Sequence, residues 1–114
     1  MYYFNTFFFC ITTERTKITV KPQNATVTEG TSVILQCRAT ADLSLELRHI
    51  WTKVGAVITS SSKIHLLEGE SVLKIPNITV NDAGVHKCVA YTPKPKGSED
   101  SAIAIVSIMG RWIS

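Results

Sequence analysis

Two cysteines with a tryptophan between them constrain the fold of this chain more than any other feature. Cys37 and Cys88 lie 51 positions apart, Trp51 stands between them, and the run Asp82-Ala83-Gly84 comes shortly before Cys88. This order is typical of a sandwich of two β-sheets, because only a long excursion of the chain brings inward-facing strands of opposite sheets together. The pattern therefore predicts an all-β sandwich.

Apolar residues alternate with polar ones along several short segments, which indicates strands with one buried face. The 114 residues, 45% of them hydrophobic, suffice for one core and hence one domain. The predicted inward side chains are Val33, Leu35 and Cys37 on one strand, His49 and Trp51 on the next before Lys53 reaches solvent, and Ala102, Ala104, Val106 and Ile108 on the last strand. A further strand is predicted at residues 72–75.

Ile103 and Ile105 make the last predicted strand apolar on both faces. A strand of this kind is either part of an interface or an aggregation risk.

A turn is predicted directly before the strand that carries Cys88. Gly84 can adopt the positive φ that such a turn requires. Asp82 is expected to form an ion pair with Lys63; the alternative is that Asp82 only caps the turn through its own backbone.

Residues 18 to 110 resemble an immunoglobulin domain of the intermediate (I) set. Within that set they are similar to the sixth, membrane-proximal immunoglobulin domain of contactin and neurofascin-type neural adhesion molecules. Three segments carry the resemblance: residues 15–20 ahead of Pro22, residues 41–51 in the long stretch between Cys37 and Trp51, and residues 105–110. The chain departs from the family at Leu43, where proline is common, and it ends in 111–114 in place of a proline-rich junction.

The resemblance implies an immunoglobulin-like sandwich of two antiparallel sheets, with a disulfide between Cys37 and Cys88 that joins them and Trp51 packed against it. The alternative is a pair of buried thiols. His86 occupies the position where the family carries a tyrosine, two residues before the second cysteine. It is interpreted as a structural histidine, with a pH-sensing role as the alternative.

Two acceptor sequons for N-linked glycans are present, Asn24-Ala25-Thr26 and Asn77-Ile78-Thr79. Together with a disulfide they favour the secretory pathway and an extracellular or cell-surface location. The alternative is two unmodified asparagines in ordinary turns.

The predicted domain covers residues 17–110, with a short tail at 111–114. Residues 1–16 are rich in aromatic side chains but have neither an early positive charge nor a cleavage site. This segment is interpreted as a poor signal peptide or an artefact of a gene model, and Cys10 within it has no evident partner.

No pattern of catalytic or metal-ligating residues is present in the sequence, so no enzyme activity, metal or cofactor is predicted. A net charge of +3 is too small to favour nucleic acid binding.

A candidate contact loop is formed by Tyr91, Lys94 and Lys96, because loops at the ends of a sandwich often bind partners.

These features predict a non-enzymatic extracellular module of a cell-adhesion or receptor protein, which mediates or spaces contacts between proteins. The resemblance implies cell-surface protein partners, homophilic or heterophilic, and neighbouring immunoglobulin and fibronectin type III domains. No small-molecule substrate is expected. Two alternatives remain: part of the ectodomain of a receptor tyrosine kinase or phosphatase, and an intracellular, titin-like structural module.

Overall fold

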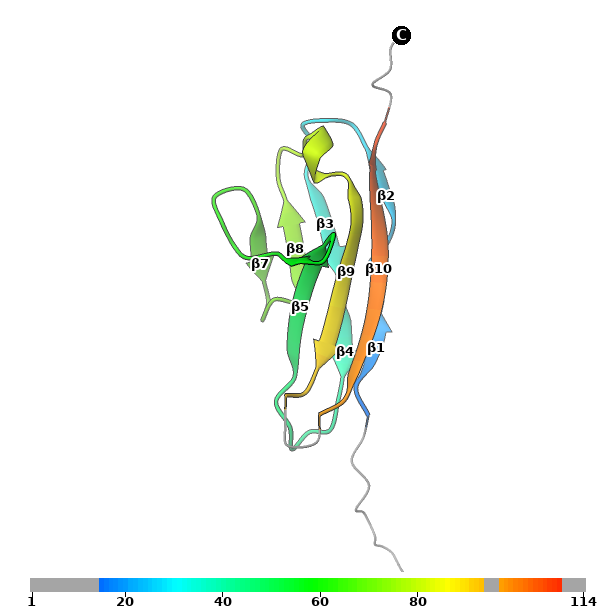
Figure 1. The fold of residues 1–114 in the computed structure, drawn as a ribbon, viewed down its shortest axis with the longest axis vertical. Helices are drawn as coiled ribbons and strands as arrows, with labels where there is room; N and C mark the ends of the chain where they lie inside the picture. The colour runs from blue at the N-terminus through cyan, green and yellow to red at the C-terminus, as the bar shows by residue number, and fades with distance from the viewer. Residues whose placement is uncertain (1–14, 94–96, 110–114) are drawn as a thin grey trace, which may run out of the picture.

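A computed structural model describes residues 15–93 and 97–109 of the chain (Figure 1). This part folds into ten β-strands and one short 3-10 helix. The elements are β1 (Lys17–Val20), β2 (Ala25–Val27), β3 (Val33–Gln36), β4 (Arg38–Thr40), β5 (Arg48–Lys53), β6 (Ala56–Val57), β7 (His65–Leu67), β8 (Val72–Ile75), η1 (Val80–Asp82), β9 (Gly84–Tyr91) and β10 (Glu99–Ile108).

The strands form two layers that face each other (Figure 1). One layer is a five-stranded sheet in the order β2-β10-β9-β5-β6. The other layer combines the three-stranded sheet β3-β8-β7 with the pair β1-β4. A hydrogen bond continues this layer from β3 to β4: the backbone N–H of Cys37, between these strands, donates over 2.9 Å to the carbonyl of Ser71, just before β8. The predicted all-β sandwich is therefore confirmed.

The core lies between the layers, and its side chains alternate with exposed ones as the sequence predicted. Val33 and Leu35 are buried while Ile34 between them is 55% exposed, and Ala104 and Val106 are buried on β10. The fully enclosed centre is made of Leu35, Cys37, Trp51, Leu73, Ile75, Ile78, Cys88, Ala90, Ala104 and Val106. Hydrophobic burial of this set is the main force that holds the two layers together.

One strand pairing differs from the antiparallel pattern expected for the sheets. β2 runs parallel to β10, with Ala25 opposite Val106, whereas β1 pairs antiparallel with β4 in the other layer. The first extended segment thus changes sheet between β1 and β2. Pro22 lies in this connection and cannot donate a ladder hydrogen bond, which favours the break at this point.

The predicted ends of the domain are only partly within the described residues. Residues 1–14, which make up nearly all of the aromatic-rich segment and include Cys10, lie outside them, as does the tail at 111–114. The boundaries 17 and 110 therefore stay predictions.

Candidate functional site

The disulfide between Cys37 and Cys88 forms the centre of the sandwich. It joins the segment between β3 and β4 to β9, both cysteines are fully buried, and their Cα atoms are 6.5 Å apart. Trp51 on β5 lies directly opposite Cys88 in the sheet and donates its indole N–H to the carbonyl of Glu70 over 2.9 Å. The predicted bridge and its tryptophan are thus brought together.

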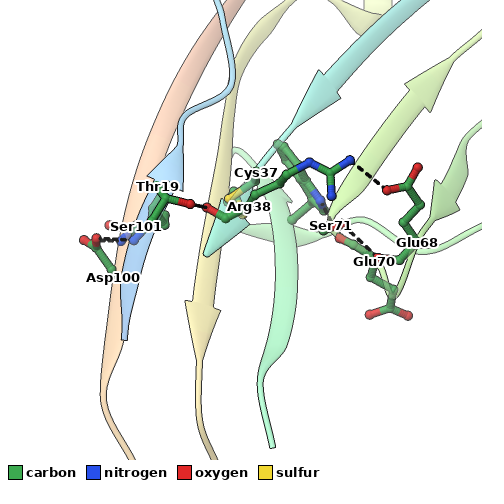
Figure 2. The surroundings of a disulfide bond; sticks show 11 residues. Thr19, Cys37, Arg38, Glu68, Glu70, Ser71, Asp100 and Ser101 are labelled. Carbon is green, nitrogen blue, oxygen red and sulfur yellow. Dashed lines mark hydrogen bonds and ion pairs between the residues drawn. A yellow bond between two sulfur atoms is a disulfide. The ribbon is translucent and has the colours of Figure 1, made fainter. Parts of the chain in front are cut away.

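The rim beside the disulfide is polar (Figure 2). Arg38, the residue after Cys37, extends its guanidinium to the Glu68 carboxylate over 2.9 Å. Both side chains are about half exposed, so the pair contributes little to stability. Glu68, Gly69 and Glu70 all have positive φ, which makes this turn costly for the two glutamates. The Trp51 hydrogen bond to Glu70 is one of the contacts that hold the turn in place.

The turn between β8 and β9 brings Lys63 and Asp82 together. Lys63 Nζ lies 2.9 Å from Asp82 Oδ2. The same carboxylate accepts hydrogen bonds from the backbone N–H and the hydroxyl of Thr79. Burial acts to raise the pKa of Asp82, but the Thr79 and Lys63 hydrogen bonds outweigh it and lower that pKa. Asp82 therefore both caps the turn and forms the ion pair. Gly84 follows with a φ of 136°.

We expect Asp82→Ala to destabilise the domain by about 2 kcal/mol, because it removes an ionised acceptor of local hydrogen bonds. Lys63→Met is the matched control. The Lys63 side chain is 40% exposed, so its loss should cost less than about 1 kcal/mol. Urea unfolding of both variants checks this prediction. Equal losses would show that the ion pair, and not the cap, stabilises the turn.

Two histidines point into the core from the five-stranded sheet. His86 is 1% exposed, and its Nδ1 lies 3.3 Å from the carbonyl of Gly84. His49 is 8% exposed, and neither of its ring nitrogens has a hydrogen-bond partner among the described residues. Burial lowers the pKa of His49, with Glu70 opposing the shift. Burial also lowers the pKa of His86, and the positive charge of Lys53 lowers it further, whereas the hydrogen bond to Gly84 raises it.

These depressed pKa values predict a domain that loses stability in mild acid. The unfolded histidines bind protons near their ordinary pKa of 6.5, while the folded ones resist protonation. The unfolding free energy is therefore fully present above pH 6.5 and falls as the pH drops through 6.5 toward the folded pKa values. Urea unfolding on either side of pH 6.5 measures this slope.

The His49→Leu variant isolates one of the two contributions. It removes two buried unpaired nitrogens, so we expect about 1 kcal/mol of added stability at neutral pH and a smaller slope in acid. A slope unchanged in His49→Leu would contradict the role of this residue.

The hairpin between β9 and β10 contains the candidate contact loop. Tyr91 ends β9 and is half-buried, whereas Lys94 and Lys96 lie outside the described residues. The base of the hairpin is closed by the backbone N–H of Thr92, which donates to the carbonyl of Ser98, and by the Ser98 N–H, which donates to the Thr92 hydroxyl.

The sequence did not predict the structural role of three further residues of this hairpin, Gly97, Ser98 and Asp100. The Ser98 hydroxyl accepts from the backbone N–H of Thr16, and Asp100 accepts from the N–H of Ile18, so the hairpin anchors β1. A Cβ atom at Gly97 would overlap the carbonyl oxygen of Thr92. Gly97, a glycine between two predicted strands, indicates a turn at this point in the sequence. The contacts of Ser98 and Asp100 give no local signal, since they join residues 82 positions apart.

Both sequon asparagines are exposed. Asn24 accepts a hydrogen bond at Oδ1 from the backbone N–H of Ile105 over 2.8 Å, which leaves its Nδ2 for a glycan. Asn77 has a φ of 54° in the turn after β8, a conformation that asparagine tolerates well.

No group of three His, Cys, Asp or Glu side chains within residues 15–93 and 97–109 is arranged to hold a metal ion. In the same part of the chain, no helix has the length and apolar character needed to cross a membrane. His49, His65 and His86 lie on three different strands, β5, β7 and β9.

Sequence comparison connects these features to known proteins. The profile described as "Immunoglobulin domain" matches residues 16–91. Sidekick-1 of Gallus gallus is 31% identical over 92% of the chain, neural cell adhesion molecule L1.1 of Danio rerio 38% over 68%, and contactin-6 of Homo sapiens 38% over 72%. The chain spans only 5%, 7% and 8% of these proteins, respectively.

Solved structures support the same architecture. Titin domain M7 superposes with a TM-score of 0.73 at 23% identity, covering 89% of this chain and all of that one. Immunoglobulin domains 1–5 of sidekick-1 give a TM-score of 0.70 at 23% identity, covering 88% of this chain and 21% of that one. At this identity the similarity concerns the fold alone.

Proposed function

Because the chain belongs to the immunoglobulin domain family, we propose that it is a non-enzymatic extracellular module of a cell-adhesion or receptor protein. It mediates or spaces contacts between proteins, and its binding depends on surface complementarity. The observation that carries this proposal is the Cys37–Cys88 disulfide in a domain homologous to a neural cell adhesion molecule. Fold alone would not suffice, since one fold serves many functions.

The extracellular location rests on covalent chemistry. Disulfides persist in secreted and cell-surface proteins and are rare in the cytosol, where thiols are kept reduced. The exposed asparagines of two sequons add a second signal for the secretory pathway, with glycans proposed on Asn24 and Asn77.

The spacing role rests on the positions of the first and last strands. β1 begins at one end of the sandwich and β10 finishes at the opposite end (Figure 1). A domain entered at one end and left at the other can stand in a row between neighbours. We therefore place it beside further immunoglobulin and fibronectin type III domains of a longer protein, and we assign the hairpin around Tyr91, Lys94 and Lys96 to partner contact.

Mass spectrometry of the native chain from its source cells tests this proposal. Digestion before and after reduction identifies the cysteine pairs, and glycosidase treatment identifies occupied asparagines. We expect the Cys37–Cys88 bridge together with a glycan on Asn24 or Asn77. In a Thr26→Val variant the first sequon is lost while Asn24 stays, so any glycan on Asn24 should disappear.

Free thiols together with bare asparagines would overturn the extracellular proposal. They would favour the alternative of an intracellular structural module, a kind of protein to which the titin domain with the same fold belongs.

A further inference from the structure

The outer face of the five-stranded sheet carries several apolar side chains that are exposed to solvent, with the polar residues Thr52, Lys87 and Ser101 among them. β5, β9 and β10 lie side by side in this sheet (Figure 1). The strand register sets their outward-facing residues in level rows. Ile103 is 55% exposed, Val85 47% and Ile105 43%. The apolar members of this outer face are Ile50, Val57, Val85, Val89, Tyr91, Ile103 and Ile105.

A shallow depression marks one end of the outer face. It has a volume of about 370 Å³ and is lined by Ile50, Val89, Tyr91 and Glu99. Apolar side chains beside charged ones are typical of a protein interaction site, because burial of such side chains removes apolar area from water.

The charges at this end are arranged symmetrically about the central strand. Tyr91 on β9 lies opposite Glu99 of β10 on one side and opposite Arg48 of β5 on the other. Neighbouring strands are about 4.8 Å apart, so an acidic residue on one adjacent strand and a basic residue on the other flank Tyr91. Both flanking residues are exposed, and Arg48 also pairs with Glu46 over 2.9 Å.

This arrangement is complementary to itself. A two-fold axis that lies between two outer faces, parallel to β9, puts β10 of each copy over β5 of its partner. Glu99 then faces Arg48 of the partner copy, and Arg48 faces the partner's Glu99. In the same arrangement Tyr91 and Val89 pack against their own counterparts along the axis. Sheets pack face to face in this aligned manner in sandwich cores.

We propose that the outer face of the five-stranded sheet binds a second copy of this chain, with two Glu99–Arg48 pairs flanking a contact centred on Tyr91 and Val89. The occupant is a second copy because the charge pattern is complementary to itself. This inference names a partner for the contact role proposed above and rests on it.

Two residues limit where the contact is centred. Lys87 lies on β9 on the same face, so the axis brings the two Lys87 side chains toward each other, which opposes association. Asn24 accepts a hydrogen bond from the backbone N–H of Ile105, so a glycan on Asn24 would border the far end of the outer face. The contact therefore involves the end that carries Tyr91, Arg48 and Glu99.

Sedimentation equilibrium of the full chain with Cys10→Ser, treated with glycosidase, tests the inference. We expect a reversible dimer. Arg48→Glu places like charges opposite Glu99 of the partner copy, and Glu99→Arg does the same opposite Arg48. Each variant alone should dimerise at least roughly tenfold more weakly. An equimolar mixture of the two should regain the dimer, because each copy then offers the charge that the other needs.

Two further variants sharpen the test. Lys87→Ala should tighten the dimer. Lys74→Glu, on β8 in the opposite layer, is the matched charge change and should leave the dimer unaffected. A wild-type chain that is monomeric at all concentrations, single variants that dimerise normally, or a mixture that stays monomeric would each overturn the inference. The cysteine and glycan analysis is independent of this result, so failure of one proposal is distinguishable from failure of the other.

Discussion

Cys37→Ala is expected to lower the free energy of unfolding by about 4 kcal/mol, on the loop-closure estimate for a loop of this length. The bridge spans 51 positions, and its removal frees the unfolded chain. The change also leaves Cys88 as an unpaired thiol in a fully buried position. Small domains are stable by only about 5 to 15 kcal/mol, so most of the folded population is at risk.

Urea unfolding followed by circular dichroism measures this loss. The experiment uses a Cys10→Ser background, so that no third thiol can exchange with the bridge. The Cys37→Ala/Cys88→Ala double variant is the control and should be about as unstable as the single variant, because the bridge is already lost in the first step. An unchanged unfolding midpoint in Cys37→Ala would exclude the bridge as a main source of stability.

Trp51→Ala is expected to cost about 3 to 5 kcal/mol, the range measured for removal of large aromatic side chains from cores. Trp51 is only 1% exposed and is among the largest of the fully buried side chains. The substitution leaves a cavity between the layers beside the disulfide. It also removes the donor to the carbonyl of Glu70, in a turn with three consecutive positive φ values.

Trp51→Phe separates these two effects. Phenylalanine retains most of the apolar volume but has no N–H, so we expect a loss of about 1 to 2 kcal/mol from the unpaired carbonyl. The same unfolding experiment compares both variants with the unchanged chain. Equal losses in Trp51→Phe and Trp51→Ala would indicate that the hydrogen bond, and not the volume, determines the contribution of this residue.

Much of the fold was predictable because its signals are local. The alternation at Val33 and Leu35 indicates one buried face wherever the strand lies in the sandwich. Glycine at position 84 indicates a turn for a similar reason, since positive φ is a property of the single residue. The strand at Val72–Ile75 was predicted with its observed bounds.

The contacts that could not be predicted join residues far apart in the chain. The unpaired ring of His49 depends on which groups pack around it, and alternation reveals only that it points inward. The bonds of Thr16 to Ser98 and of Asn24 to Ile105 link positions more than eighty residues apart. The parallel pairing of β2 with β10 is of the same kind.

The outer face of the five-stranded sheet also combines a feature predictable from the sequence with one that depends on the tertiary structure. The sequence indicates that Ile103 and Ile105 are apolar on the outer side of a strand, but it does not indicate which strands lie beside them. Tertiary structure places Tyr91 between Glu99 and Arg48, because strand register aligns three separate segments into one row.

Local signals along the chain suffice to predict the two-layer β architecture and the pair of cysteines at its centre. These features follow from local periodicity, turn chemistry and the spacing of a few side chains. The tertiary structure shows which strand ends anchor one another, which buried histidine has no hydrogen-bond partner among the described residues, and where opposite charges flank an apolar side chain. Such features depend on the packing of segments distant in the chain, which the local conformational preferences of the residues do not determine.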